Sequence, residues 1–187
     1  MRLFIAINLP AAERRGIAEA VAPLRAKTNG VSWVKEEALH LTMKFLGEYD
    51  DAHASRLSAA LGAIAGVHRP IELEISGIGA FPHWRAPRVI WAGVGDSPKL
   101  EILHHEIESA CADLGHELEG RPFRPHITVG RVRAPLDRED ARALGEAARA
   151  ISYSSGAVAE SVDLMSSATG AGGSRYAIVA VLPLRGA

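Results

Sequence analysis

The chain has 187 residues, 48% of them hydrophobic and 23% charged, with a formal net charge of −1 at pH 7. These values are ordinary for a soluble globular protein, and the length suffices for a core that needs no disulfides. A net charge so close to zero excludes a global attraction to nucleic acid or to an anionic membrane, so any basic character must be local.

Redox and targeting features favour the cytoplasm. Cys111 is the only cysteine, which excludes an internal disulfide and favours a reducing compartment. The opening MRLFIAINLP has only a short apolar run that ends in proline, which is not the pattern of a signal peptide. No apolar stretch approaches the length of a membrane span. We therefore expect a cytoplasmic protein without a membrane partner.

The first half of the chain predicts strands and helices in alternation. A strand is expected over RLFIAIN from Arg2, and a helix over AAERRGIAEAVAPLRAK, in which Pro23 should cause a kink or an early end. HLTMKFLG, residues 40–47, alternates as a strand does, and a helix opens after it at Asp51. IELEISGIG, from Ile71, predicts a strand with one solvent-exposed face.

The second half repeats this order at an offset of 86 residues. RVIWAGV, from Arg88, matches the first strand, and the helix SPKLEILHHEIESACADLG follows it. HITVGR, residues 126–131, matches the segment that begins HLTMKF, and another helix opens at Asp137. AVAESVDLM, from Ala157, matches IELEISGIG, and a third copy of the first strand, RYAIVAV, begins at Arg175.

This repeat predicts the fold class and the domain organisation. Alternating strands and helices joined in part by hairpins favour an α+β fold. We expect residues 1–187 to form a single domain with a bilobal, duplicated fold. Its two antiparallel or mixed sheets would carry the helices on the outside and enclose a central cleft. The glycine-rich segment 168–174 is expected to be a hairpin loop between the last two strands.

Two His-x-Thr motifs stand at equivalent places of the repeat. Side chains at positions i and i+2 of a strand share a face, so His40 shares one with Thr42, and His126 shares one with Thr128. An approximate twofold relation between the lobes would bring both faces to one cleft. Two imidazoles and two hydroxyls would then surround a common centre.

Such a centre suits acid–base catalysis on a phosphodiester. One neutral histidine can accept a proton from the attacking nucleophile while the other, protonated, donates a proton to the leaving oxygen. The hydroxyls and a nearby cation would hold the phosphate oxygens as charge moves in the transition state. We therefore expect a reaction without a metal ion or another cofactor.

Three residues near the motifs are further candidates for substrate binding. Lys44 lies two positions after the first threonine and is expected on the same face. Arg131 would point away from the second histidine in a regular strand, but Gly130 allows a bulge that would redirect it. Phe45 is equivalent to Arg131 in the repeat and offers a ring for a base to stack on. The alternative is a solvated rim for the cations and a core position for Phe45.

With these residues, the sequence resembles the two-histidine (2H) phosphoesterase superfamily. The resemblance is to its bacterial and archaeal RNA 2′,3′-cyclic phosphodiesterases, historically called 2′-5′ RNA ligases. Both motifs, HLTM and HITV, match the His-x-Thr-x pattern without departure. The similarity extends nearly from end to end, through RLFIAINLP, WVKEEALHLTMKFLGE, FPHWRAPRVIWAGV, RPFRPHITVGR and the closing VLPL.

The resemblance implies an activity, a partner and a role for each histidine. RNA with a terminal 2′,3′-cyclic phosphate, tRNA fragments among the candidates, would be hydrolysed to a 2′-phosphomonoester. His40 would donate a proton to the leaving 3′ oxygen, and His126 would accept one from water; the near-symmetric motifs alone leave these roles open. The reverse reaction, 2′-5′ ligation, is regarded as secondary. A monomer is expected, because the repeat supplies both halves of the site.

Two other functions stay open at this point. The same site could act on a small cyclic nucleotide, or the cleft could bind RNA ends without catalysis. Other candidate residues favour ordinary structural roles. His104 and Glu108 have the spacing of helical metal ligands, but nothing completes a ligand set, so a solvated face is expected. The other histidines do not belong to a motif. His105 is part of the same solvated helix face, and four more are expected to reach solvent: His53, His68, His83 and His116.

Overall fold

The computed structural model describes residues 1–170 and 173–186. Its elements in chain order are β1 (Arg2–Asn8), α1 (Ala11–Arg25), β2 (Val31–Trp33), η1 (Glu36–Ala38), β3 (His40–Glu48), α2 (Asp51–Ala65), β4 (Ile71–Phe81), β5 (Val89–Val94), α3 (Pro98–Asp113), β6 (His126–Val132), α4 (Arg138–Arg149), β7 (Ser154–Ala159), β8 (Ser161–Gly170) and β9 (Gly173–Pro183). The expected hairpin between β8 and β9 is paired as far as Gly170 and Gly173. Residues 171–172 of its loop lie outside the described part.

The strands form a single curled sheet in two halves. Over the described residues the order is β7-β4-β5-β6-β3-β1-β8-β9, with β2 paired to β6, and every pairing is antiparallel. Within the described part of the chain, the halves β7-β4-β5-β6 and β3-β1-β8-β9 are joined through β3 and β6, which pair at Leu41 and Ile127. The α+β class is confirmed, and the two expected sheets are these halves, joined at their edges.

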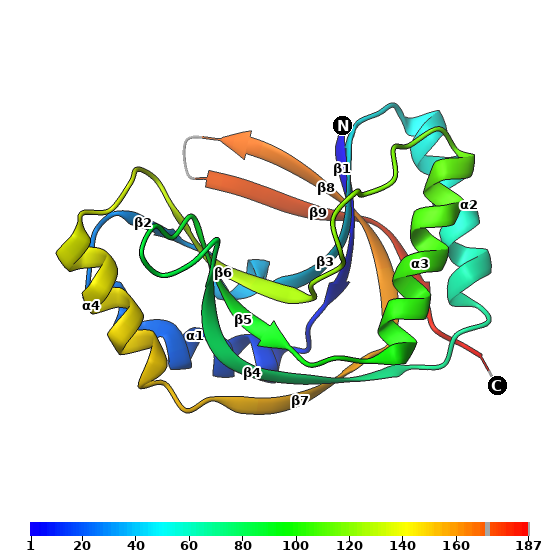
Figure 1. The fold of residues 1–187 in the computed structure, drawn as a ribbon. Helices are drawn as coiled ribbons and strands as arrows, with labels where there is room; N and C mark the ends of the chain where they lie inside the picture. Colours follow the sequence, from blue (N-terminus) through cyan, green and yellow to red (C-terminus); the bar gives the residue numbers. More distant parts are fainter. Residues whose placement is uncertain (171–172, 187) are drawn as a thin grey trace.

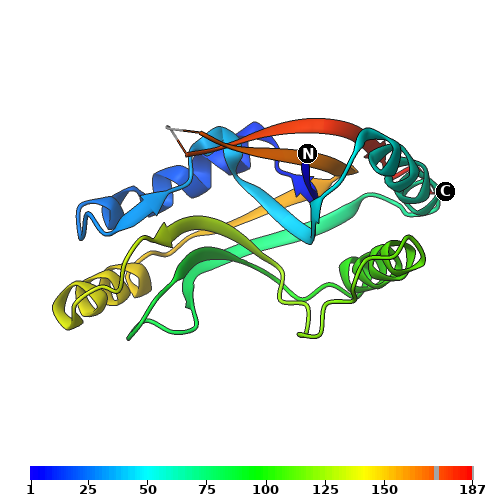
Figure 2. The same ribbon diagram turned by 90° about the horizontal axis from the view of Figure 1, so that it is seen from above.

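The helices pair at the two ends of the molecule (Figures 1 and 2). α1 packs with α4 and against β7, while α4 also contacts β4. α2 packs with α3 and against β8 and β9, while α3 contacts β3. Each pair therefore takes one helix from each half of the sequence and covers one half of the sheet.

Side-chain caps explain where three of the helices begin. The carboxylates of Asp50 and Asp137 accept hydrogen bonds from the backbone N–H groups three residues later, as does the hydroxyl of Ser97. The expected early end of α1 at Pro23 is wrong, because the helix continues to Arg25. Proline removes one backbone donor there, while the fully buried Leu24 holds the last turn against the core.

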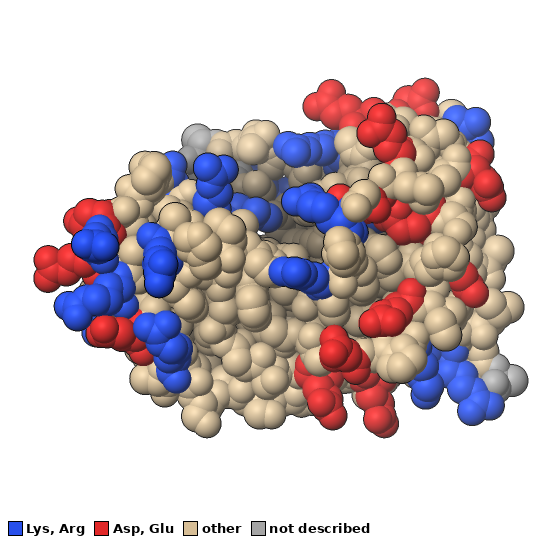
Figure 3. All heavy atoms as spheres, in the orientation of Figure 1, with Lys and Arg blue, Asp and Glu red and all other residues tan. Residues whose placement is uncertain are grey.

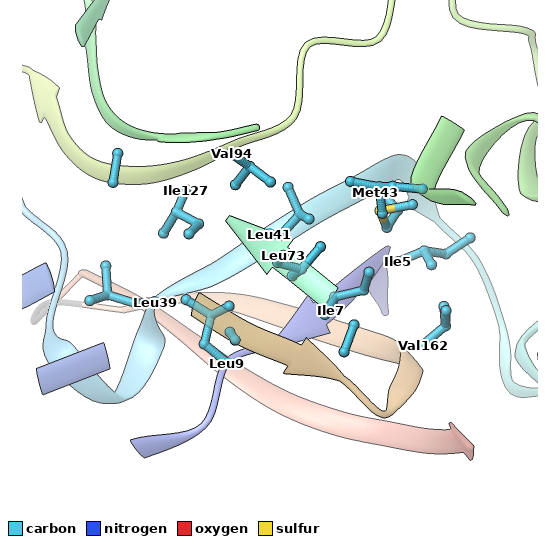
Figure 4. Close-up of a cluster of buried hydrophobic side chains, with 14 of the residues drawn as sticks. Ile5, Ile7, Leu9, Leu39, Leu41, Met43, Leu73, Val94, Ile127 and Val162 are labelled. Atoms are coloured by element: carbon cyan, nitrogen blue, oxygen red, sulfur yellow. The ribbon is translucent and has the colours of Figure 1, made fainter. Parts of the chain in front are cut away.

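The main core lies between the sheet and the helices. Figure 4 shows Leu41 and Met43 of β3, Ile127 of β6 and Ile5 of β1 among the apolar side chains of this core. Alternation in β4 is confirmed: Ile71, Leu73 and Ile75 are buried and their polar neighbours exposed. A smaller cluster, formed by Phe4, Ala6 and Met165 with Tyr176 packed against it, is separate from this core.

Elements 86 residues apart correspond in type. Adding 86 to the bounds of β1, α1, β3 and α2 leads to β5, α3, β6 and α4, within two residues at each end. The segment from Ala157 departs from this pattern, because AVAESVDLM spans the end of β7 and the start of β8 rather than one strand. On this correspondence we propose that the chain is one domain with two related halves.

Among the described residues, the helices are all too short or too polar to span a membrane.

Candidate active site

The two His-x-Thr motifs lie on β3 and β6, at the junction of the two halves of the sheet. Leu41 and Ile127, the middle residues of the motifs, pair with each other and are fully buried. The four motif side chains with polar groups alternate with them and are half-buried; they are His40, Thr42, His126 and Thr128. They therefore occupy the face of the sheet opposite the core.

The antiparallel register sets the histidine of each motif beside the threonine of the other. With Leu41 opposite Ile127, the register places His40 beside Thr128 and Thr42 beside His126. The two histidines are diagonal neighbours, a relation that in a regular antiparallel pair separates residues by about 7–8 Å. The structure thus brings the sequence-predicted residues together around an approximate twofold axis through the Leu41–Ile127 pair.

Each imidazole is oriented by a backbone carbonyl two residues before it. His40 Nδ1 lies 2.8 Å from the carbonyl oxygen of Ala38, and His126 Nδ1 lies 2.7 Å from that of Arg124. A carbonyl oxygen can only accept, so the proton is on Nδ1 in both rings. In the neutral form Nε2 of each ring then carries the lone pair that can take up a proton.

Aromatic rings hold the two imidazoles in different surroundings. The His40 ring has its centroid 5.1 Å from that of Phe4 and 5.2 Å from that of Tyr176, which it meets edge-on. The His126 ring meets Phe81 edge-on, with centroids 5.0 Å apart. Tyr176 and Phe81 were not identified from the sequence, since neither lies near a motif in the chain.

Both histidines favour the neutral form. Burial lowers the pKa of His40 below 6.5, and the hydrogen bond to Ala38 only partly opposes this effect. Burial likewise lowers the pKa of His126, against the opposing hydrogen bond to Arg124. The charge of Arg131 lowers the pKa of both rings further. One cation therefore lies within electrostatic reach of both imidazoles.

A bulge in β6 explains how Arg131 reaches this face. Ile90 of β5 pairs with Gly130 while Trp91 pairs with Thr128, which leaves Val129 as an extra residue. Val129 and Gly130 are both buried and Arg131 is exposed, so the alternation shifts by one position. Glycine fits at 130 without a shift of its neighbours, whereas a Cβ there would lie 2.8 Å from Val31 Cγ1.

The same bulge occurs in β3 and brings Phe45 to the exposed side. Ile5 pairs with Lys44 while Ala6 pairs with Thr42, which leaves Met43 as the extra residue. Phe45 is 66% exposed, its ring centroid lies 6.2 Å from that of Phe4, and it is one of the residues that line a pocket of about 630 Å³. The ring is available to a ligand, and the alternative of a core position for Phe45 is wrong.

The bulge also overturns the expected position of Lys44. Its side chain is buried on the core side, where Nζ donates to both carboxylate oxygens of Glu108, at 2.8 and 2.9 Å, and to the carbonyl oxygen of Glu117 at 2.9 Å. All three ammonium protons are used. Strict alternation from Thr42 placed Lys44 on the wrong face, and it has no donor left for a substrate.

Other histidines also differ from the sequence expectation. His53 and His116 were expected to reach solvent, but they are buried with their Nε2 atoms 2.8 Å apart. The ring of His104 stacks on that of Phe123, with centroids 3.8 Å apart. The expectation that His104 and Glu108 lie on a solvated helix face is wrong, because the Glu108 carboxylate is buried and hydrogen-bonded to Lys44. No cluster of three or more potential metal ligands occurs among the residues that the structure describes.

Basic side chains gather around a hollow on the face shown in Figure 3. In the view of Figure 1, the hollow falls between β6 and the β8–β9 hairpin. Acidic side chains on this face lie over the end formed by α2 and α3, with others at the lower edge and at the α4 end. The chain has an overall charge of −1, but the surroundings of this hollow are locally positive, which favours an anionic ligand.

The sequence matches the 2′-5′ RNA ligase superfamily over residues 13–170. The chain belongs to this superfamily. The match covers both His-x-Thr motifs and the strands that carry them, so the residues at the junction of the sheet lie inside the family's shared region.

Relatives from other organisms extend this similarity. The chain is 34% identical over 152 residues to the RNA 2′,3′-cyclic phosphodiesterase of Geobacillus stearothermophilus, an alignment that covers 80% of this chain and 48% of that protein. The chain thus spans about half the length of that relative. It is 37% identical over 135 residues to the protein of the same name from Methanocaldococcus jannaschii, which covers 71% of this chain and 72% of that one.

The fold is shared with solved structures of similar length. The crystal structure of TT0787 from Thermus thermophilus matches with a TM-score of 0.84 at 28% sequence identity, covering all of this chain and 99% of that one. The curled sheet with helix pairs at both ends is therefore shared with that structure.

Proposed function

We propose that this protein hydrolyses the terminal 2′,3′-cyclic phosphate of RNA to a 2′-phosphomonoester by metal-independent acid–base catalysis. The observation that carries the proposal is the pair of imidazoles on one face of the sheet, each with Nδ1–H held by a carbonyl and Nε2 left for proton transfer. Relatives named RNA 2′,3′-cyclic phosphodiesterase support the substrate class.

Each imidazole has one task in the proposed reaction. His126 Nε2 accepts a proton from a water molecule as its oxygen attacks phosphorus. The bond from phosphorus to the 3′ oxygen breaks, and His40 donates its Nε2 proton to that oxygen. The products are a 2′-phosphomonoester and a free 3′ hydroxyl. This division of roles comes from the family resemblance, because the hydrogen bonds of the two rings are alike.

Thr42, Thr128 and Arg131 are the proposed phosphate-binding groups. The register places a threonine beside each imidazole, and Arg131 lies within electrostatic reach of both rings. Hydroxyl and guanidinium donors around the phosphorus would stabilise the charge that develops on its oxygens. Phe45, exposed beside this face, is proposed to stack on the base of the terminal nucleotide.

The charge of the substrate resolves a protonation problem. His40 must be protonated to act as an acid, yet burial and Arg131 lower its pKa in the free protein. A bound phosphodiester anion offsets the charge of Arg131 and favours the protonated form of the neighbouring imidazole. Substrate binding is therefore expected to raise the pKa of His40 into the working range.

Several finer points are part of the proposal. The same site, with a 5′ hydroxyl attacking phosphorus in place of water, would form a 2′-5′ linkage between RNA ends and release the 3′ oxygen as a hydroxyl. Because the junction of the sheet contains both motifs of one chain, we propose that a monomer is active. The compartment proposed is the cytoplasm, in line with the free, buried thiol of Cys111.

The experiment is to incubate the protein, in EDTA, with an oligonucleotide that ends in a 2′,3′-cyclic phosphate, and to identify the monoester formed. The expected product is the 2′-phosphate. Formation of a 3′-phosphate would contradict the assignment of the leaving oxygen, and an unchanged cyclic phosphate would leave only an RNA-end binding role.

A further inference from the structure

A second pocket lies at the end of the molecule where α4 meets the loop between β4 and β5. Its volume is about 620 Å³, and its lining includes Trp84 and Arg85 of the loop together with Arg138, Arg142 and Arg149 of α4. Within the described part of the chain, this lining contains four arginines and no acidic residue. In a chain with a net charge of −1, such a concentration of guanidinium groups is a local feature.

The arginines of α4 form one row. Positions 138, 142, 145 and 149 are spaced by four, three and four residues, which places them along one helix face. Arg138, Arg142 and Arg149 are exposed. The fourth member of the row is Gly145, so the row has a gap between two cations.

The indole of Trp84 fills this gap. A Cβ at position 145 would lie 3.1 Å from Trp84 Cβ and 3.2 Å from Trp84 Cγ. Glycine is less favourable than alanine in a helix interior, and here it allows an aromatic ring to lie directly on the helix. Trp84 is half-buried in this position, so its ring packs on α4 and still borders the pocket.

We propose that this pocket binds a single-stranded segment of the substrate RNA upstream of its cyclic phosphate end; the proposal rests on the proposed function. Guanidinium groups suit phosphates, and an aromatic surface suits an unstacked base. A duplex offers no free base face to Trp84, which favours a single strand as the occupant. The pocket is defined here by Trp84, Arg85, Arg138, Arg142 and Arg149 and is named the arginine pocket.

The loop that carries Trp84 and Arg85 begins and ends beside the active site. Phe81, the last residue of β4, meets the His126 ring with centroids 5.0 Å apart, and Val89, the first residue of β5, pairs with Arg131. The loop between these two residues leads to α4, where it lines the arginine pocket. An RNA strand with its cyclic phosphate at the histidines is therefore expected to continue along this loop into the arginine pocket.

One acidic group competes with RNA at the rim. Glu146 lies 3.6 Å from Arg142, in an exposed i,i+4 pair. Such exposed pairs contribute little to stability. An RNA phosphate can therefore displace Glu146 from Arg142 at small cost. A merely solvated helix face would not account for the indole of Trp84, which packs between the arginines of α4.

The test compares two substrates in two double variants. Both substrates end in a 2′,3′-cyclic phosphate; one is a dinucleotide and the other a single-stranded 15-mer. In Arg138→Gln/Arg142→Gln, the ratio of kcat/KM for the 15-mer to that for the dinucleotide should fall roughly tenfold. The matched control, Lys99→Gln/Arg185→Gln, removes two exposed charges from α3 and the C-terminal segment and should keep the wild-type ratio.

A binding measurement separates this proposal from the proposed function. Fluorescence anisotropy with a 15-mer that ends in a 3′ hydroxyl needs no hydrolysis. The slope of log Kd against log salt should fall by about 1.4 in the Arg138→Gln/Arg142→Gln variant, since each phosphate contact on a single strand contributes about 0.7. An unchanged slope and an unchanged substrate ratio would overturn the arginine pocket, whereas failure of the wild type to hydrolyse either substrate would overturn the proposed function alone.

Discussion

At the scale of single residues, the two histidines share one hydrogen-bonding pattern and differ in their neighbours. Each donates its Nδ1–H to the carbonyl oxygen two residues earlier. His40 packs against Phe4 and Tyr176, whereas His126 meets Phe81 edge-on. The sequence predicted the pairing of the motifs but not these rings, because they come from strands that only the fold brings near the histidines.

Arg131 provides a test of the site's electrostatics. Its charge lowers the pKa of both histidines, and the bell-shaped pH profile of kcat/KM reports those pKa values in the free enzyme. Arg131→Met should therefore raise both values and move the bell to higher pH. It should also lower kcat/KM by roughly 10²-fold, as the loss of a transition-state donor does.

The neighbouring Arg133 is the matched control for Arg131. Its guanidinium donates to the carbonyl oxygen of Asn29 at 2.8 Å, and it is not among the causes that shift either histidine. Arg133→Met should leave the bell at its wild-type position. A bell that stays in place in Arg131→Met, or moves equally in both variants, would contradict the electrostatic role.

At the scale of elements, the matching bulges of β3 and β6 decide which side chains reach the site. Alternation from the threonines placed Lys44 on the active face and left Arg131 facing away. The extra residues Met43 and Val129 reverse both assignments. Gly130 signalled the bulge in β6, but no residue of HLTMKFLG signals the one in β3. Register therefore depends on pairing with β1 and β5, which a local pattern does not contain.

The buried pair of Lys44 and Glu108 connects the two motifs. Lys44 on β3 also binds the carbonyl oxygen of Glu117, and Glu108 accepts from the backbone N–H of Glu119 at 3.0 Å. Residues 117 and 119 belong to the segment that leads from α3 into β6. The ion pair therefore anchors the chain that positions His126.

Removal of Lys44 tests this anchor. Lys44→Met leaves Glu108 buried without its partner, which should lower the free energy of unfolding by about 3–5 kcal/mol in urea denaturation. Lys44→Met/Glu108→Leu removes both charges and should lose less than the single variant, yet it should still lose kcat/KM because the segment before His126 is no longer held. A single variant as stable as the wild type would contradict the structural role of the pair.

At the scale of the whole molecule, the sequence predicted the α+β class, most element positions and the two motifs. The sequence predicted the structure less well where tertiary contacts determine the strand pairing or the burial of a side chain. The three-residue strand β2 pairs with β6, and the segment from Ala157 divides into two strands on opposite sides of the sheet. His53 and His116, far apart in the chain, find each other in the interior. None of these pairings has a local signal.

Buried histidines should make the fold sensitive to acid. Burial is the largest cause that lowers the pKa of His40, His104, His116 and His126 below 6.5. The unfolded state then binds more protons than the folded state, so stability is complete above pH 6.5 and is lost as pH falls through the lower folded values. Urea denaturation should therefore show a smaller free energy of unfolding at pH 5.5 than at pH 7.5.

A double variant separates the active-site contribution to this pH dependence. His40→Gln/His126→Gln removes two of the four titrating rings and should flatten the loss of stability between pH 7.5 and pH 5.5. Equal stability of the wild type at both pH values, or an unchanged loss in the double variant, would show that burial does not hold these rings neutral.

The most direct test of two imidazoles acting on one phosphorus atom is a double-mutant cycle. The wild type, His40→Ala, His126→Ala and the double variant are compared on an oligonucleotide ending in a 2′,3′-cyclic phosphate. Each single variant should lose about 10²–10⁴-fold in kcat, and the double variant should lose little more than the worse single one, because the two rings act as a unit. Full activity in either single variant, or losses that multiply in the double variant, would contradict a shared site.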